Sequence, residues 1–452
     1  MKFSPSCDTM VALGSVTASG HPVFAKNSDR EPNEAQYLVQ QPRATHEEPM
    51  VQCTHVAIPQ VERTHAFIGS QPWWIWGLEH GINEHGLAVG NEAAWSRDEA
   101  SVEPGLLGMD YVRIALERAT TATEALHLVT ALLEEHGQSG SCSFEGQTAY
   151  QNSFIFADPT TAWVLETSAR HWVARQVTDV ASISNVYSIG TEYDLISRDA
   201  VQHAVDNGWH DPSQPFSWTL AYTDTGLDRL PSCRARLGRS GSLLAGDGTR
   251  TGVVPATMMG FLRDHSDDSG RTGNDWAPSA SSEGSLCMHA ATAEGFETAA
   301  STVAELHGDA GRGNATIWAS LASPCMSVFV PLWNDLEVPT ELRRPESLAG
   351  PDLWWRTETT QRRVERYFDV LHPVVAQLVD VEQAALLADE AATPADGRAD
   401  LTRRAVAAAQ AHVEHVADLV ERTGFEGRVP PTDRRATYLD DVGTGASLPA
   451  TA

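Results

Sequence analysis

The feature that most constrains this chain is a predicted β-hairpin at its start, with a cysteine at one end and a charged cluster at the other. Residues 7–13 and 21–29 have strand-like composition and flank a glycine-containing turn. Because a hairpin returns the end of its second strand to the start of its first, Cys7 and the charged cluster at 26–30 are expected to be neighbours. A thiol beside cations and a carboxylate suits an activated sulfur nucleophile, since positive charge stabilises the thiolate. The alternative is a buried cysteine at a strand edge beside a surface charge cluster.

Length and charge exclude several classes of function. The chain has 452 residues, which is room for about three average domains, and 42% of them are hydrophobic, so a large core is expected. Lys plus Arg total 32 against 60 Asp plus Glu, and the formal net charge of −28 repels nucleic acid and anionic membranes. We expect neither of these as a partner. Lys2 and Lys26 are the only lysines, which draws attention to the one inside the charged cluster.

The cysteines and the absence of long apolar runs bear on location and on metals. No run approaches the roughly 18 apolar residues of a membrane span, and the first six residues are too short and polar for a secretory signal, so a cytoplasmic location is predicted. The six cysteines are scattered, which argues against disulfides and against a zinc site. His80 and His85 are predicted to lie in a surface loop, and Cys287 and His289 to pack in the core. We expect no metal and no cofactor.

Hydrophobic periodicity predicts two blocks of strands with helices between and after them. The predicted helices cover 106–119, 122–136, 193–206, 231–245, 251–264, 353–390 and 399–423. The predicted strands include 72–78, 153–157, 162–166, 172–176, 181–189, 285–290, 297–305, 315–321 and 326–332. The last two helices are expected to form a helical hairpin. Two strand blocks with these helices favour two stacked sheets sandwiched by helices.

Several short motifs, in order along the chain, resemble those of the secernin family of cysteine dipeptidase-like proteins. They are Cys7-Asp8-Thr9, Lys26-Asn27-Ser28-Asp29-Arg30, Trp73-Trp74-Ile75-Trp76-Gly77, Asn83-Glu84-His85-Gly86, Gly90-Asn91-Glu92-Ala93, Ser184-Asn185-Val186, Cys287-Met288-His289-Ala290 and Ser323-Pro324-Cys325. Several motifs at compatible spacing are more specific than any one of them. The resemblance implies the N-terminal-nucleophile hydrolase fold, which is an α+β, four-layer αββα sandwich. In that superfamily the nucleophile is the first residue of the mature chain, and its own α-amine serves as base.

The resemblance and the composition together divide the chain into four parts. Residues 1–6 are expected to be a propeptide-like segment, and 7–345 the αββα domain. Residues 346–425 are expected to form a C-terminal helical extension. Residues 426–452 have the Pro, Gly, Thr and Ala content of a disordered tail.

The resemblance also implies roles for individual residues, with Cys7 as the nucleophile. The bile-salt and penicillin V hydrolases, which look distantly similar, carry a basic residue and an aspartate three apart after the nucleophile hairpin. Lys26 and Asp29 have that spacing. The usual residue is arginine, so whether Lys26 or Arg30 supplies the charge is left open. Asp29 would orient the α-amine and stabilise its charged form, although it could instead pair with Arg30 or cap a turn.

Two asparagines and one further arginine complete the implied site. Asn91 and Asn185 match the positions that donate hydrogen bonds to the oxyanion, with structural turn residues as the alternative interpretation. The arginine is Arg234 or Arg236, and the sequence does not choose between them. We assign substrate binding to Arg234 together with the two cations of the charged cluster.

The chemistry implied by these residues is amide hydrolysis. An α-amine has a pKa of about 7.7–8.0 and a thiol about 8.5, so amine and thiol on one residue are matched for proton exchange near neutral pH. Hydrolysis then needs acylation of the sulfur, protonation of the leaving amine and attack of water on the thioester, with donors ready for each oxyanion. Dipeptides are the predicted substrates and another linear N-acyl amide is the second choice. A non-catalytic interaction protein on the same scaffold is the alternative, and a homo-oligomer is left open.

Overall fold

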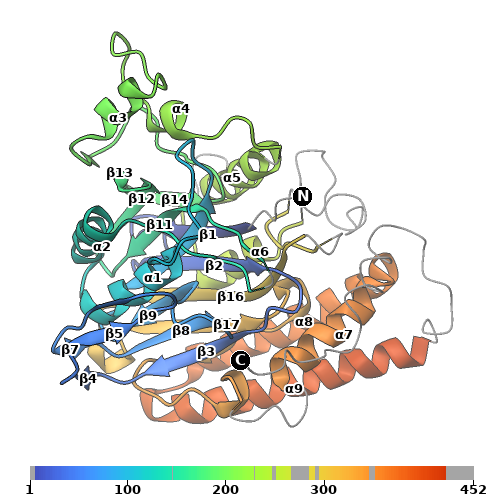
Figure 1. The fold of residues 1–452 in the computed structure, drawn as a ribbon. Coiled ribbons are helices and arrows are strands. Elements are labelled where there is room, and N and C mark those ends of the chain that lie inside the picture. Colours follow the sequence, from blue (N-terminus) through green and yellow to red (C-terminus); the bar gives the residue numbers. More distant parts are fainter. Residues whose placement is uncertain are drawn as a thin grey trace.

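The computed structural model describes residues 6–144, 146–228, 230–246, 251–265, 285–290, 295–345 and 352–423. Two sheets of antiparallel strands are stacked face to face, and helices cover the outer face of each (Figure 1). The core between the sheets contains residues of both, such as Val11 and Phe24 from one and Ile82 and Ile155 from the other. The predicted four-layer αββα sandwich is confirmed by this order of layers.

The first sheet has six strands in the order β14-β1-β2-β16-β17-β18. Their bounds are β1 Ser6–Ala12, β2 Val23–Arg30, β14 Val180–Ile183, β16 Glu297–Leu306, β17 Ala315–Leu321 and β18 Val330–Leu332. The predicted N-terminal hairpin is confirmed, because β1 pairs antiparallel with β2 and places Cys7 opposite Ser28. The charged end of β2 therefore lies beside the first residues of β1, at the end of the hairpin away from its turn.

The second sheet has eight strands in the order β15-β13-β12-β11-β10-β9-β8-β3. Their bounds are β3 Gln36–Gln41, β8 Phe67–Pro72, β9 His80–Asn83, β10 Ala88–Ala94, β11 Gln151–Ala157, β12 Ala162–Ser168, β13 His171–Gln176 and β15 Leu195–Ile196. Two short ribbons pair β4 Ala44–Thr45 with β7 Arg63–Thr64 and β5 Met50–Gln52 with β6 Ala57–Pro59. The strand predicted over 72–78 is wrong, since the aromatic run follows β8 as turns and bends. There the side-chain amide of Gln71 donates to the carbonyls of Ile75 and Trp76 in place of a ladder.

Helices α1 Gly108–Arg118 and α2 Ala122–His136 lie on the outer face of the eight-stranded sheet. Thr121 caps α2 by accepting a hydrogen bond from the Glu124 amide, as the capping-box signal predicted. Four more helices follow, namely α3 Ala200–Asp206, α4 Trp218–Tyr222, α5 Leu230–Ala245 and α6 Pro255–Leu262. The helix predicted over 193–206 is shorter than expected, because its first residues form β15 at the sheet edge.

The C-terminal helices are α7 Leu353–Glu365, α8 Phe368–Ala392 and α9 Arg398–Thr423. They lie together on the side of β17 and β18 (Figure 1). The single helix predicted over 353–390 is broken at Tyr367, whose φ of −134° and ψ of 44° are not helical. Among the described helices α8 alone is long and apolar enough to cross a membrane, and a helix packed on a protein core passes the same test. Here Leu371, Val375 and Val379 of α8 are buried in the core.

Short connections complete the architecture. The described part of the chain contains four 3₁₀ turns, namely η2 Ala310–Arg312, η3 Pro324–Met326, η4 Thr340–Leu342 and η5 Ala395–Gly397. Residues 285–290 are irregular, so the strand predicted there is wrong. The amide of Met288 donates to the Thr298 hydroxyl instead of to a strand partner. The predicted tail at 426–452 lies outside the described residues, and the division of the chain at residues 6, 345 and 425 stays a prediction.

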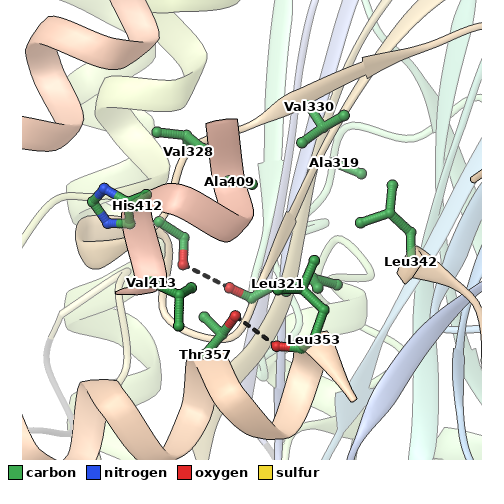
Figure 2. A pocket seen from close by; sticks show the side chains of 11 residues that line it. Ala319, Leu321, Val328, Val330, Leu342, Leu353, Thr357, Ala409, His412 and Val413 are labelled. Atoms are coloured by element: carbon green, nitrogen blue, oxygen red, sulfur yellow. Dashed lines mark hydrogen bonds between the residues drawn. The ribbon is translucent and has the colours of Figure 1, made fainter. Parts of the chain in front are cut away.

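A small cavity lies beneath the C-terminal helices. It measures about 20 Å³ and is lined mostly by apolar side chains from the β17–β18 region, α7 and α9, including Leu321, Leu353 and Val413 (Figure 2). This is room for about one water molecule. None of the predicted site residues lines it, so we interpret it as a packing gap between the helices and the sheet.

Candidate active site

Cys7 lies near the start of β1, between the two sheets, and is only 4% exposed. Its Sγ accepts a hydrogen bond from the Asp29 amide at 3.3 Å, and it lies 3.7 Å from the Asp29 carbonyl and 3.9 Å from Glu79 Oε2. Burial raises the pKa of the Cys7 thiol well above its usual range, although the positive charge of Lys26 acts in the opposite direction. In the described chain the sulfur is therefore a thiol that can donate to a neighbouring oxygen.

The backbone nitrogen of Cys7 is held by Asn185. The Cys7 amide donates to Asn185 Oδ1 at 2.9 Å, and Arg236 Nη2 donates to the same oxygen at 2.7 Å. The other end of the side chain, Nδ2, donates to the Ala93 carbonyl at 2.9 Å. Two donors on one atom fix it as the oxygen, so Asn185 presents an acceptor to Cys7 here. The donor role in an oxyanion hole, which the family resemblance implies for Asn185, stays a prediction.

The arginine of the site is Arg236, and Arg234 is exposed on the other side of α5. Arg236 shares the buried face of the helix with Cys233 and Ser240, three residues before it and four after it. Its Nη1 donates to Asp8 Oδ2 at 2.8 Å and to the Cys7 carbonyl at 3.4 Å. The assignment of Arg234 to the site is therefore wrong, and Arg236 takes its place.

Lys26 is completely buried between the sheets. Its ammonium donates to the Asn91 carbonyl at 2.7 Å and to Glu92 Oε2 at 3.0 Å, and the Thr9 hydroxyl donates to the other oxygen of Glu92. Burial acts to lower the pKa of Lys26, but the negative groups around it hold that pKa above its usual value. The absence of a side chain at Gly90 makes room, because a Cβ there would lie 2.8 Å from Lys26 Cδ.

Arg30 is also buried and paired at the end of β2. Its Nη1 donates to Glu79 Oε1 at 3.0 Å, and its Nη2 donates to Glu34 Oε1 at 2.6 Å and to the Cys142 carbonyl at 2.9 Å. Both predicted substrate-binding cations therefore have carboxylate partners already. Lys26 and Arg30 therefore do not offer an unpaired positive charge to a substrate.

Asp29 contacts Cys7 through its backbone, whereas its carboxylate points to the other face of the sheet. Oδ1 accepts a hydrogen bond from the Thr298 hydroxyl at 2.6 Å, and Oδ2 has no hydrogen-bond partner among the described residues. Burial raises the pKa of Asp29 to about 7, with Arg236 opposing the rise and Asp8 adding to it. A carboxyl group with an open oxygen thus lies beside the Ser6–Cys7 junction, because Ser6 is the residue opposite Asp29 in the β1–β2 ladder.

Asn91 is linked to the Cys7 hairpin through Lys26. It is buried on β10, its Nδ2 donates to Asn152 Oδ1 at 3.0 Å, and its Oδ1 has no partner in the part of the chain that the structure describes. Its link to the hairpin runs through its own carbonyl and Lys26. Of the four predicted catalytic residues, Asp29 and Asn185 each contact Cys7, and Asn91 contacts Lys26 on the second strand of the same hairpin.

Buried carboxyl groups are the site residues that sequence reasoning missed. Besides Asp29, four carboxyl groups that are at most 2% exposed surround the hairpin end, namely Asp8, Glu34, Glu79 and Glu92. They face three cations, which are Lys26, Arg30 and Arg236. A signal existed for one of them, since Glu92 is the only charged residue of strand β10 and follows Asn91 directly. Five acids against three cations leave this cluster able to accept further positive charge.

Of the two histidines predicted to lie in a surface loop, His80 differs from that setting, whereas His85 lies in a turn. His80 is 1% exposed on β9, and its Nε2 is 2.8 Å from the Thr302 hydroxyl, so the surface loop predicted for it is wrong. Burial holds the pKa of His80 well below its usual value. His85 is half-buried, with its Nε2 3.1 Å from His65 Nδ1. Neither histidine contacts Cys7.

Comparisons with known proteins give this geometry a context. Residues 16–189 match the family described as acyl-coenzyme A:6-aminopenicillanic acid acyl-transferase. The matched region contains Lys26, Asp29, Asn91 and Asn185 and begins after Cys7. A dipeptidase of Bifidobacterium longum is 27% identical over 217 residues, which is 42% of this chain and 39% of that protein. The chain therefore matches less than half of the length of this relative.

Solved structures with a similar course of the chain are less similar in sequence. A variant of the conjugated bile acid hydrolase of Clostridium perfringens is 13% identical and covers 69% of this chain, with 89% of its own chain covered and a TM-score of 0.40. A penicillin V acylase of Agrobacterium tumefaciens is 12% identical and covers 70% of this chain, with 83% of its own covered and a TM-score of 0.36. The fold is accordingly assigned from this chain's own layers and strand order.

Proposed function

We propose that this chain is a cysteine amidohydrolase in which Cys7 becomes the N-terminal nucleophile after residues 1–6 are removed. The observation that carries the proposal is that both reactive atoms of one residue are held at the same buried site. The Cys7 nitrogen donates to Asn185 Oδ1, and the sulfur accepts from the Asp29 amide. The sequence matches to an acyl-transferase family and to a dipeptidase support chemistry at an acyl group.

Maturation in this proposal is self-cleavage between Ser6 and Cys7. The Cys7 sulfur attacks the Ser6 carbonyl carbon, the C–N bond breaks, and the thiol proton passes to the nitrogen, which becomes the α-amine. Glu79 is placed to relay that proton, because its Oε2 is the carboxylate oxygen 3.9 Å from the sulfur. Water then hydrolyses the thioester and releases the hexapeptide, which vacates the position of the buried Ser6.

In turnover the new α-amine takes the place of the peptide nitrogen and acts as general base for the sulfur. Its charged form is favoured by the excess of acids over cations around the hairpin end. Asp29 Oδ2, which has no hydrogen-bond partner among the described residues, is the group proposed to receive it. Asn91 and Asn185 are proposed to donate to the oxyanion, for which Asn185 Nδ2 has to leave the Ala93 carbonyl.

The proposed substrates are dipeptides, by analogy with the relative described as a dipeptidase. The match to an acyl-transferase family favours a second candidate, hydrolysis of another linear N-acyl amide. Because Lys26 and Arg30 are neutralised by buried carboxylates, neither is proposed any longer to bind a substrate carboxylate. A non-catalytic role is disfavoured by the intact thiol and its two hydrogen-bonded neighbours.

The test combines intact mass, N-terminal sequencing and hydrolysis of a panel of dipeptides and N-acyl amides by purified protein. We expect active wild-type protein to begin at Cys7. The Cys7→Ala variant should keep the hexapeptide, lose activity and retain its melting temperature, while a control at another buried cysteine, Cys53→Ala, should be processed and active. Fully active protein that still begins at Met1 or Lys2 would contradict the N-terminal-nucleophile mechanism.

A further inference from the structure

A second buried cluster of chemically reactive side chains lies outside the candidate active site. His265 follows α6, Cys287 and His289 belong to the irregular segment 285–290, and Cys325 lies in η3. One possible ligand atom from each lies within 4.8 Å of the others. Their exposed fractions are 8%, 0%, 0% and 4%, respectively. Two thiols and two imidazoles thus converge on one point from three separate parts of the chain.

The distances between these atoms are those of a tetrahedral site. His289 Nε2 lies 3.5 Å from the sulfur of Cys287, 3.5 Å from that of Cys325 and 3.3 Å from His265 Nε2. With Zn–S bonds of about 2.3 Å and Zn–N bonds of about 2.0–2.1 Å at tetrahedral angles, the expected separations are about 3.6 Å for S···N and about 3.3 Å for N···N. The three measured separations therefore agree with one tetrahedral ion bound between these atoms.

We propose that His265, Cys287, His289 and Cys325 bind one zinc ion. Sulfur and imidazole ligands in this number select zinc over magnesium or calcium, which prefer oxygen. Two thiolates balance the charge of the ion, so the complex is neutral, which its deep burial requires. Four protein ligands leave no open position, and the site is therefore structural, not catalytic.

The surroundings of the cluster are those of a metal-bound histidine. His289 Nδ1 donates to Glu365 Oε1 at 2.5 Å, which fixes the tautomer in which the Nε2 lone pair faces the two sulfurs and can bind the ion. Glu365 ends α7, so the site also ties that helix to the cluster. The Phe368 ring lies 5.6 Å from the His289 ring and 5.8 Å from that of His265, and this aromatic cover keeps water out.

The proposed zinc site lies in a segment that contacts the strand carrying Asp29. Met288, between two of the ligands, donates through its amide to the Thr298 hydroxyl at 2.9 Å, and Thr298 donates to Asp29 Oδ1 at 2.6 Å. Asn27 Nδ2 donates to the Leu286 carbonyl at 2.8 Å. Zinc therefore holds an irregular segment against β2, next to the carboxyl group beside Cys7. This inference stands on the cluster alone and does not depend on the proposed hydrolysis.

No zinc site is expected from the sequence, because the six cysteines are scattered along the chain. The principal competing state is a disulfide between Cys287 and Cys325, which needs no metal. Neither cysteine forms a disulfide in the structure, and each sulfur lies 3.5 Å from His289 Nε2, which is close to the separation expected for two ligands of one ion.

The experiment is elemental analysis and native mass spectrometry of the full-length protein, purified without a metal-affinity step. We expect about one zinc per chain. Chemical modification of the cysteine thiols should release about one zinc ion per chain. Co²⁺ exchanged for the zinc should show the visible absorption bands of tetrahedral cobalt and a thiolate-to-cobalt charge-transfer band. These measurements on wild-type protein remain decisive even where a variant fails to fold.

The matched variants are Cys287→Ser and Cys325→Ser, with Cys53→Ser as a buried-cysteine control outside the cluster. We expect each cluster variant to lose at least tenfold in zinc affinity, measured by competition with a chelator, and the control to keep its zinc. Protein that contains no metal, that carries a Cys287–Cys325 disulfide, or whose zinc content is unchanged in both cluster variants would overturn the proposal.

Discussion

The side-chain amide of Asn185 is proposed to serve Cys7 in two states, before and after the chain is cut between Ser6 and Cys7. Its oxygen holds the Cys7 nitrogen in the described chain, while its nitrogen is engaged by the Ala93 carbonyl. Arg236 donates to the same oxygen and to the Cys7 carbonyl, so it locks this orientation. A switch to oxyanion donation requires that lock to loosen once the peptide nitrogen has become an amine.

Replacing Asn185 by Ala is expected to lower turnover about 10²–10³-fold with little change in KM, the usual cost of one oxyanion donor. Asn185→Asp keeps an acceptor for the Cys7 nitrogen but offers no N–H, and it should therefore lose as much turnover as the Ala variant. Steady-state kinetics measures both, with Asn207→Ala on an exposed helix end as the control. Near-normal turnover in the Asp variant would show that Asn185 only holds the nitrogen.

Asp29 gives a prediction about stability and pH. Burial raises its pKa from 3.8 to about 7 in the folded chain, so the folded state binds a proton more tightly than the unfolded state. Its contribution to stability is therefore fully present below about pH 4 and is lost as pH rises through about 7. Asn at this position has no charge to bury. Asp29→Asn should thus gain stability over the parent from pH 4 to pH 8, by up to about 4 kcal/mol.

The measurement is denaturant unfolding of Cys7→Ala with and without Asp29→Asn, because the Cys7→Ala background keeps the chain uncut and avoids a new α-amine beside the carboxyl. Subtracting the two curves cancels the other titrating groups. A difference in unfolding free energy that stays constant over this pH range would mean that Asp29 is ionised throughout, with Arg236 as its effective partner.

At the scale of elements, the contact between the two sheets depends on one glycine. Gly90 on β10 lies against Lys26 of β2, and a Cβ there would also approach Phe24 Cζ at 3.1 Å and Thr9 Oγ1 at 3.3 Å. Because Lys26 is held by Glu92 and by the Asn91 carbonyl, its stem has no room to move away without breaking a buried ion pair.

Gly90→Ala is therefore expected to destabilise the chain by about 1–3 kcal/mol through overpacking between the sheets. Gly238→Ala is the matched control, since it lies in the middle of α5 with nothing within 4 Å of the added Cβ and should stabilise by about 0.5–1 kcal/mol. Urea unfolding of both variants decides the matter. Equal effects of the two substitutions would show that the sheets relax around residue 90 without cost.

The elements that sequence patterns predicted well are those specified locally. The β1–β2 hairpin follows from two strand-like runs around a turn, and α2 follows from its Thr121 cap. The sequence of α5 could also have indicated Arg236, because its spacing from Cys233 and Ser240 places it on the same face of the helix. The turn at 73–78 was missed because distant residues hold it, since the Trp76 amide donates to the Thr54 hydroxyl and Arg113 donates to the Trp76 carbonyl. The break at Tyr367 was missed as well.

At the scale of the whole molecule, what the sequence could not reveal are groupings of distant residues. The carboxyl groups around Cys7 come from β1, β2, the segment after β2, the residue before β9, and β10. The proposed zinc ligands come from three segments separated by long connections, so no motif of fixed spacing contains them. In both places the clustering follows from the stacking of two sheets, which brings together positions that carry no local signal.

The net charge of −28 leads to a prediction at this same scale, on the basis of the proposed dipeptide hydrolysis. The field of so acidic a chain repels anionic substrates and attracts cationic ones over distances that salt shortens, with a Debye length of about 10 Å at about 0.1 M ionic strength. Raising ionic strength from about 0.02 M to about 0.5 M should therefore raise kcat/KM severalfold for a dipeptide of two acidic residues. It should lower kcat/KM for one that contains lysine and leave a dipeptide of two alanines almost unchanged. The neutral substrate is the internal control for effects of salt on the fold. If all three substrates respond in parallel, the surface field does not influence substrate capture, and the charge of this chain serves solubility alone.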